Sequence, residues 1–199
     1  MALTIGLTGG MGSGKTTVGR SFEALGYQVY YADDRAKLLY DVDDHLKRMI
    51  TQVAGSDVYD SNDKLIRARL SEKIFQDKAL LSKVNALVHP AVKRDFESWR
   101  EAIPETYARP FILKEAAILF EAGTDTALDG VITVYAPKRT RLARVLHRDG
   151  THAEHVLARM NHQWPDGMKI LCSDFIIYND GLHAISTQIA ASIRHFSER

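Results

Sequence analysis

The residues most suited to chemistry lie near the amino end, where Gly9–Thr16 read G-G-M-G-S-G-K-T. The run fits the pattern G-x-x-x-x-G-K-[ST], in which glycines let main-chain N–H groups point at phosphate oxygens. It follows the apolar run Leu3–Leu7 and precedes a helical stretch, whose free N–H groups and dipole also favour an anion. Lys15 would reach the β- and γ-phosphates of a nucleoside triphosphate, and the Thr16 hydroxyl would ligate Mg²⁺. A plain glycine-rich turn before a helix is the alternative.

We therefore expect this loop and the helical turn after it to bind the phosphates of ATP. The expected contacts are Gly10, Met11, Gly12, Ser13, Gly14, Lys15, Thr16 and Thr17. Loops of this kind serve small-molecule kinases, GTPase switches and motor-type ATPases. The chain has no N-K-x-D segment, and no glycine follows an aspartate by three residues, which disfavours a GTPase. Its length of 199 residues disfavours a motor.

Asp33 is the second candidate for chemistry because it closely follows the strand candidate Val29–Tyr31. A carboxylate at that place can accept the proton of a substrate hydroxyl as the hydroxyl attacks the γ-phosphate. Asp33 could instead hold Mg²⁺ through water. A third interpretation is that Asp33 or its neighbour Asp34 only caps the next helix.

A cluster of arginines is the third candidate. Arg141, Arg144 and Arg148 are spaced three and four residues apart, which places them on one helix face, opposite Leu142 and Leu146. The arginines that flank this face are Arg139 and Arg159. Arginine on a mobile segment can close over a transferring phosphoryl group and stabilise its charge. For any single arginine the alternative is a solvated charged face.

The region after the arginines is expected to be a mobile lid, with Gly150-Thr151 as its hinge. Four histidines gather there: His147, His152, His155 and His162. No arrangement of carboxylates completes a metal site with them, so we interpret them as surface residues and assign them no metal.

Composition excludes several broad classes. Net charge is +1, so no global basic field argues for nucleic acid. The single cysteine, Cys172, excludes an internal disulfide and is interpreted as a small buried residue. No apolar stretch is long enough to span a bilayer, and no cleavable leader precedes the first strand. These features favour a cytoplasmic enzyme, a monomer or weak homo-oligomer, that binds small molecules without nucleic acid or membrane.

Short apolar strands alternate with helical segments, which predicts an α/β fold with helices on both faces of a parallel sheet. The expected strands are 3–7, 27–31, 111–113, 131–135 and 174–178. Pro90 is expected near a helix start or break. We predict a nucleotide-binding core over 1–33, 100–138 and 170–199, a helical substrate-covering domain over 34–99, and a lid over 139–169. Sites in such folds lie at the carboxyl ends of the strands.

Further runs resemble one family, the dephospho-coenzyme A kinases, almost end to end. The matching runs are Ile5–Thr16, Ala32-Asp33, Leu87–Pro90, Ala117–Glu121, Arg144, Arg148-Asp149, Gln163, Lys169 and Asp174–Gly181. Tyr31 replaces the first Asp of the family's D-A-D element but leaves Asp33, its proposed base, in place. Ala117 replaces a proline, and Ser173 replaces an alanine. Arg141 stands where the family usually has Gln, so we assign it no role.

The resemblance implies a three-layer P-loop kinase fold and a reaction. ATP would phosphorylate the ribose 3′-hydroxyl of dephospho-coenzyme A, which is the last step of coenzyme A synthesis. In that reaction Lys15, Thr16 and Mg²⁺ would hold the triphosphate, and Asp33 would deprotonate the hydroxyl. Arg148, with Arg144, would close on the transferring phosphoryl group.

Three more roles follow from the resemblance alone. His89 would lie in the domain that covers the acceptor, although His89-Pro90 could merely start a helix. Asn179 would lie near the adenine of ATP, although Asn179–Gly181 could be a plain turn between strand and helix. Glu121 would bind substrate, and it could cap a helix or pair with a lid arginine.

Two rival functions also fit this sequence. One is a kinase of the same architecture that acts on a nucleoside monophosphate. The other is a nucleotide-dependent binding module that hydrolyses ATP slowly and has no acceptor.

Overall fold

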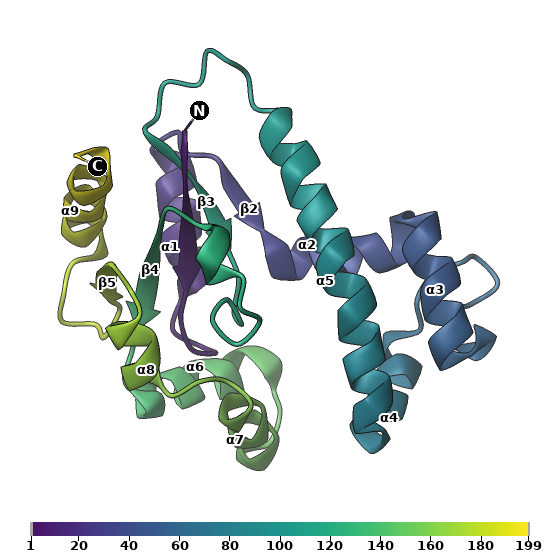
Figure 1. Cartoon of the computed structure of the whole chain (residues 1–199). Helices are drawn as coiled ribbons and strands as arrows, with labels where there is room; N and C mark the ends of the chain where they lie inside the picture. The colour runs from purple at the N-terminus through teal and green to yellow at the C-terminus, as the bar shows by residue number, and fades with distance from the viewer. Residues whose placement is uncertain (1, 199) are drawn as a thin grey trace. The chain divides into compact units, whose positions relative to one another are not determined.

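The computed structural model describes residues 2–198, and within that range it contains a five-stranded parallel sheet (Figure 1). The strands are β1 (Leu3–Thr8), β2 (Val29–Tyr31), β3 (Phe111–Glu115), β4 (Gly130–Tyr135) and β5 (Phe175–Tyr178). Their order across the sheet is β2-β3-β1-β4-β5, and every neighbouring pair is parallel. The α/β class and the parallel sheet predicted from the alternation of strands and helices are confirmed.

The sheet is covered on both faces. Helices α1 (Lys15–Ala24) and α9 (Ile185–Ser197) pack with strand residues such as Leu7 in the main apolar core. Gly6 belongs to the other face, where a Cβ on this residue would lie 2.7 Å from Leu128 Cδ1. The segment after β3 therefore comes so close to β1 that a side chain at this position would clash.

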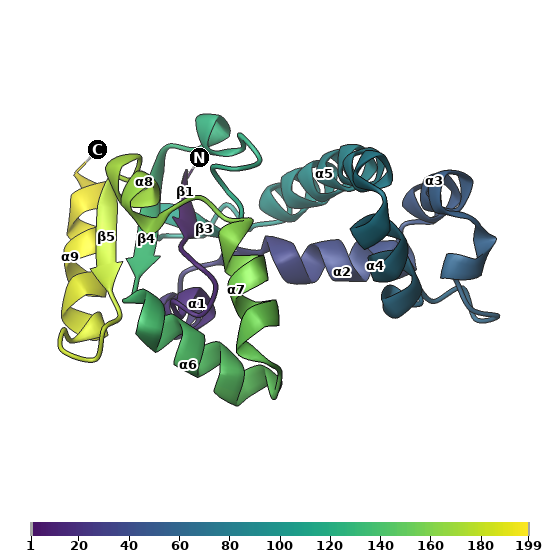
Figure 2. The ribbon, with the colours of Figure 1, turned by 90° about the horizontal axis from the view of Figure 1, so that it is seen from below.

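The carboxyl ends of β1, β3 and β4 meet at one edge, because Leu7 pairs with Glu115 and Thr8 pairs with Thr133. The loop that begins at Gly9 starts from this edge. Three helices follow β4: α6 (Lys138–Asp149), α7 (Ala153–Asn161) and α8 (Asp166–Leu171). Figure 2 shows α6 and α7 side by side, joined by an apolar cluster of Val145, Val156 and Met160. The loop at Gly9 and these helices thus lie after the strand ends at which we predicted the site.

Residues up to Tyr31, together with those from Ala108 onward, form one compact unit, and Ala32–Tyr107 form a second. The second unit contains α2 (Ala32–Val42), α3 (Asp44–Ala54), α4 (Arg67–Gln76) and α5 (Lys78–Glu101), with its own apolar core. Two aspartates start its helices: Asp43 accepts the Leu46 N–H at 3.0 Å, and Asp77 caps α5. The boundaries 34–99 and 139–169 that we predicted for a substrate domain and a lid stay predictions.

The predicted break at Pro90 is wrong, because α5 runs unbroken through it for 24 residues. Proline in a helix interior removes one hydrogen bond and costs about 3 kcal/mol. Val84 and Val88 before the proline and Ala91 after it are buried in the same core. Packing on both sides of the proline therefore holds the helix together, which the local sequence could not reveal.

The interpretation of Cys172 as a buried residue is also wrong, since its side chain is exposed. Cys172 follows the short helix α8, whose buried residue is Lys169, while Leu171 is 81% exposed. The inward position of α8 is thus taken by a charged residue rather than by its apolar neighbours. Among residues 2–198, no helix is long and apolar enough to cross a membrane.

Candidate functional site

The loop between β1 and α1 has a backbone that only glycine can follow at two positions. Gly12 has φ 79°, and a Cβ on it would lie 2.5 Å from the Arg141 carbonyl oxygen. Gly14 has φ 93°, and a Cβ on it would lie 2.1 Å from Asn179 Nδ2. A positive φ and a close neighbour both exclude larger residues. The glycine pattern read from the sequence is therefore required by this packing.

The polar side chains of the loop and of the helical turn after it are either buried or exposed. Lys15 is buried, and its Nζ donates a hydrogen bond to the Gly9 carbonyl oxygen at 3.0 Å. Thr16 and Thr17 are exposed in the first turn of α1. Ser13 is fully buried, yet its Oγ has no hydrogen-bond partner within the part of the chain that the structure describes. Buried polar groups are normally paired, so Ser13 Oγ is an exception within this loop.

The side chains of Asn179 and Arg144 form a short series of contacts that ends at the loop. The Asn179 side-chain amide donates to the Ser13 carbonyl oxygen at 2.7 Å, and Arg144 NH2 donates to the Asn179 carbonyl oxygen at 3.0 Å. The NH1 group of Arg144 is buried and lacks a partner among the described residues. The structure therefore places one anchored guanidinium group beside the phosphate loop, with donor capacity left over.

The Asn179–Gly181 turn combines this contact with local capping. Asp180 Oδ1 accepts the N–H groups of Leu182 at 2.9 Å and His183 at 3.1 Å. The hydrogen bond from Leu182 is the main reason that the pKa of Asp180 falls to about 2. Asp180 is therefore a turn residue, whereas Asn179 contacts the loop.

Arg148 has no recorded contact with the loop. Its side chain is 64% exposed, and its Nε donates to Asp149 Oδ1 at 2.6 Å. This hydrogen bond raises the pKa of Arg148 and lowers that of Asp149. Arg159 also lies near Asp149, at 3.6 Å. The arginines predicted to act as a group are thus in different environments, and a catalytic role for Arg148 stays a prediction.

Arg141, to which we assigned no role, is the most buried arginine of the helix, with 5% exposure. Its Nε donates to the Ala136 carbonyl oxygen at 3.0 Å, and NH1 donates to the Met11 carbonyl oxygen at 3.2 Å. NH2 forms an ion pair with Asp166 at the start of α8. Arg141 therefore connects the phosphate loop with the segment after α7.

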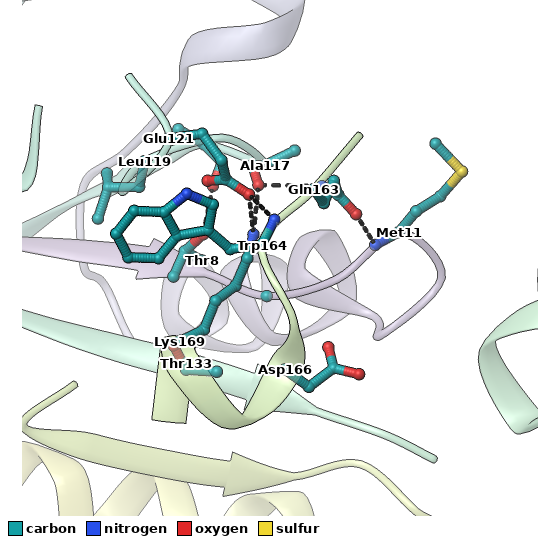
Figure 3. Close-up of polar contacts among 12 residues, drawn as sticks. Thr8, Met11, Ala117, Leu119, Glu121, Thr133, Gln163, Trp164, Asp166 and Lys169 are labelled. Carbon is teal, nitrogen blue, oxygen red and sulfur yellow. Dashed lines mark hydrogen bonds and ion pairs between the residues drawn. The ribbon is translucent and has the colours of Figure 1, made fainter. Parts of the chain in front are cut away.

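A second group of contacts joins the segment after α7 with the segment after β3 (Figure 3). Lys169, with no exposed surface, pairs with Glu121 Oε1 at 2.7 Å and donates to the Ala117 carbonyl oxygen at 3.1 Å. Glu121 Oε1 also accepts the Trp164 N–H at 2.8 Å. Glu121 was expected to bind substrate and to cap a helix or pair with a lid arginine. Its partner is instead a buried lysine, and its second oxygen, Oε2, is buried without a partner among the described residues.

The buried pair gives a stability prediction. Lys169→Met leaves the Glu121 carboxylate buried without its cation, and we expect the free energy of unfolding to fall by about 3 kcal/mol. Urea denaturation at neutral pH, followed by the fluorescence of Trp164 in a Trp99→Phe background, reports on the unit that contains the pair. The double variant Lys169→Met/Glu121→Gln should recover part of the loss, because no buried charge remains. Equal stability of the single and double variants would contradict this account.

Two predicted site residues lie in the second unit. Asp33 is half-buried in the first turn of α2, and its carboxylate has no recorded hydrogen bond or ion pair. Asp34 is exposed and pairs with Lys37 at 2.7 Å. Because α2 begins at Ala32, neither aspartate occupies the cap position, which removes the capping interpretation. His89 is exposed in the middle of α5, so it does not start a helix.

No group of three or more His, Cys, Asp or Glu residues that could hold a metal ion occurs in residues 2–198. The rings of His152 and His155 lie 6.3 Å apart. A divalent ion at the loop would therefore depend on Thr16 and on the phosphates of a bound nucleotide. That arrangement suits Mg²⁺, which takes few protein ligands and keeps most of its contacts to phosphate and water.

A parallel sheet whose central strand leads through a G-x-x-x-x-G-K-T loop into a helix defines a P-loop kinase fold. Comparison with known proteins narrows the class. The family model described as dephospho-CoA kinase matches residues 3–184. A dephospho-CoA kinase of Porphyromonas gingivalis is 38% identical over 192 residues, which cover 96% of this chain and 93% of the relative. The chain therefore belongs to the dephospho-CoA kinase family.

Solved structures agree with this fold. The crystal structure of TT1252 from Thermus thermophilus has a TM-score of 0.79 at 28% identity and covers 98% of this chain and 95% of its own. The dephospho-CoA kinase from Campylobacter jejuni has a TM-score of 0.63 at 20% identity, with 100% and 99% of the two chains covered. At that identity the second likeness bears on the fold alone.

Sequence reasoning missed the positions of Arg141, Gln163 and Lys169. Gln163 and Lys169 entered only as parts of a resemblance, and Arg141 entered as a departure from it. Their contacts with Met11, Ala117 and Glu121 link residues that are far apart in the chain, for example Met11 and Gln163, separated by 152 positions. No local spacing signals such a contact.

Proposed function

We propose that this chain transfers the γ-phosphoryl group of ATP to the ribose 3′-hydroxyl of dephospho-coenzyme A. The observation that carries the proposal is the phosphate loop, in a chain of this family, with two buried polar groups that lack a partner among the described residues: Ser13 Oγ in the loop and Arg144 NH1 in α6. Both groups suit phosphate oxygens, which accept hydrogen bonds from hydroxyl and guanidinium donors.

The triphosphate would be held by the loop and by the first turn of α1. The expected contacts are Gly10, Met11, Gly12, Ser13, Gly14, Lys15, Thr16 and Thr17. Lys15 would exchange its hydrogen bond with the Gly9 carbonyl oxygen for one with the β- and γ-phosphates. Met11 stands apart, because its N–H already donates to Gln163 Oε1 at 2.7 Å. Its expected contribution is therefore to the shape of the loop.

Mg²⁺ would be held by the Thr16 hydroxyl, which is exposed and has no recorded hydrogen bond. When bound, the ion neutralises charge on the β- and γ-phosphates. The remaining roles belong to groups of the chain itself. They fix the loop, place a guanidinium group beside it and supply a carboxylate to the acceptor hydroxyl.

The proton of the acceptor hydroxyl would go to Asp33. Asp33 follows Tyr31, the last residue of β2, by two positions, and its carboxylate is not engaged in a recorded contact. A carboxylate in this role aligns the hydroxyl for attack on the γ-phosphorus and removes its proton as the new P–O bond forms. Arg144 would stabilise the charge on the transferring group, and Arg148 would join it when the lid closes.

The acceptor would contact the second unit through the exposed imidazole of His89. Substrate would contact Glu121 through one carboxylate oxygen only. Its Oε1 already pairs with Lys169 and accepts the Trp164 N–H, which leaves Oε2 as the oxygen that could accept from a ligand.

A panel of acceptors tests the proposed function. Purified protein is incubated with ATP, Mg²⁺ and one acceptor at a time, and the phosphorylated product is identified by mass. We expect dephospho-coenzyme A to gain one phosphate and nucleoside monophosphates to gain none. Phosphorylation of nucleoside monophosphates, with dephospho-coenzyme A untouched, would identify the rival kinase instead.

The same experiment distinguishes a nucleotide-dependent binding module. Such a module binds ATP and releases ADP slowly, at a rate that no acceptor changes. The proposed kinase releases ADP in step with phosphorylation of its acceptor. ADP release that is independent of every acceptor would therefore reject catalysis of transfer.

A further inference from the structure

One residue of the phosphate loop, Met11, is held by side chains from outside the loop. Its N–H donates to Gln163 Oε1 at 2.7 Å, and its carbonyl oxygen accepts from Arg141 NH1 at 3.2 Å. Its side chain packs against the apolar cluster that joins α6 and α7. Both main-chain polar groups of Met11 are thus engaged by residues that follow it by more than a hundred positions.

Gln163 is itself fixed by a continuous series of contacts (Figure 3). Its Nε2 donates to the Ala117 carbonyl oxygen at 3.1 Å, and the same oxygen accepts from Lys169 Nζ at 3.1 Å. Lys169 in turn pairs with Glu121 at 2.7 Å. The series runs from the segment after β3, through the segment between α7 and α8, to the phosphate loop.

Arg141 holds the other side of Met11 independently of this series. Its guanidinium group is oriented by Asp166 and by the Ala136 carbonyl oxygen. A guanidinium group carries its donors on three nitrogens in one plane, so it can reach three separate acceptors, whereas all donors of a lysine are on one nitrogen. Met11 therefore has two separate supports, one on its N–H and one on its carbonyl oxygen.

Met11 needs such supports because it is flanked by Gly10 and Gly12. Glycine has the largest conformational freedom of any residue, so an unsupported loop of this composition would occupy many shapes. A ligand that binds only one of these loop shapes has an apparent Kd equal to its intrinsic Kd divided by the fraction of molecules in that shape. The contacts on Met11 raise that fraction before the nucleotide arrives.

We propose that Gln163 and Arg141 are positioning residues that hold Met11 in the loop shape that binds the triphosphate. This inference rests on the proposed function for the identity of the nucleotide. Its consequence is specific: loss of either support weakens binding of MgATP and leaves binding of the acceptor unchanged.

The main test is Gln163→Met, which keeps the length of the side chain and removes both of its hydrogen bonds. Binding of a non-hydrolysable ATP analogue with Mg²⁺ is measured by calorimetry without acceptor, and KM and kcat are measured with dephospho-coenzyme A. We expect Kd for the analogue and KM for ATP to rise about tenfold, as for the loss of the one hydrogen bond that reaches Met11. KM for the acceptor should stay within about twofold.

Two milder variants protect the test against a failure to fold. Gln163→Asn keeps the amide but is one methylene too short to reach both partners. Arg141→Lys keeps the charge for Asp166 but loses the guanidinium fork. Each should raise Kd for the analogue several-fold, and the pair combined should raise it by less than the product of the two effects, because both act on Met11.

Asp129→Leu is the matched control. Asp129 Oδ2 accepts the Thr4 N–H at 2.6 Å, so it also fixes a main-chain amide, at the other end of β1. This variant should lose stability without a change in Kd. Folded Gln163 and Arg141 variants that bind the analogue within twofold of the unmodified protein would overturn the inference. If the variants bind the analogue more weakly but the unmodified protein phosphorylates no dephospho-coenzyme A, the positioning role is supported and the proposed function is rejected.

Discussion

Replacement of Arg144 by alanine is expected to lower kcat by about 10³-fold, the lower end of the effect of an arginine that stabilises a transferring phosphoryl group. One nitrogen of this guanidinium group is anchored on the Asn179 carbonyl oxygen, and the other, NH1, is buried without a partner among the described residues. Charge on the equatorial oxygens of the phosphoryl group is greatest in the transition state, so the loss should fall on kcat more than on KM for ATP. Steady-state kinetics with varied ATP and saturating acceptor measures both.

Arg139→Ala is the control for this variant. Arg139 is an exposed arginine on the same helix, so the change in net charge and in helix composition is the same. Its kcat should stay within about twofold, as for a solvated surface charge. Similar kinetics of the Arg144 and Arg139 variants would show that Arg144 takes no part in transfer.

Replacement of Asp33 by asparagine is expected to lower kcat by about 10²-fold or more while binding of ATP is largely kept. Asparagine preserves the size of the side chain and its capacity to orient a hydroxyl, but it cannot accept the proton. Rapid-quench measurement of a single turnover isolates the chemical step, and calorimetry with an ATP analogue tests nucleotide binding separately.

Asp34→Asn provides the matched control, because Asp34 is the next residue along the same helical turn. Its side chain is 70% exposed and pairs with Lys37, its one partner among residues 2–198. Loss of such an exposed pair costs little, so both rate and stability should be nearly unchanged. A single-turnover rate in the Asp33 variant equal to that of the Asp34 variant would remove Asp33 from the mechanism. Weakened binding of Mg²⁺-ATP with an unchanged rate would instead favour Asp33 as a ligand of the metal through water.

Much of the fold could be predicted because its signals are local. Apolar runs such as Leu3–Leu7 and Val131–Tyr135 became strands. The spacing of glycines with Lys15 and Thr16 predicted the phosphate loop, since each of these residues acts on its immediate chain neighbours. The spacing of arginines placed Arg144 on one helix face as a candidate for phosphoryl transfer, but Asn179 could be connected with the site only through a resemblance to a family, because no pattern joins it to the loop along the chain.

The errors have a common cause. Pro90 was expected to break a helix, but packing on both sides of it holds α5 together. Cys172 was expected inside, but the inward position of its helix belongs to Lys169. Glu121 had two open alternatives, a helix cap or a pair with a lid arginine, and its partner is instead Lys169 at 2.7 Å. In each case a contact with a distant part of the chain outweighed the local preference of the residue.

The sequence by itself determined the class of sheet, the place and type of the nucleotide-binding loop, and the candidates for phosphate binding and proton transfer. These follow from the periodicity, conformational freedom and chemistry of residues that are near one another in the chain. Only the tertiary structure decided which side chains support the loop, because Gln163 and Arg141 reach Met11 across 152 and 130 positions. Burial also depends on the tertiary structure: Lys169 and Glu121 form a pair away from water, and Arg144 NH1 is buried without a partner among the described residues.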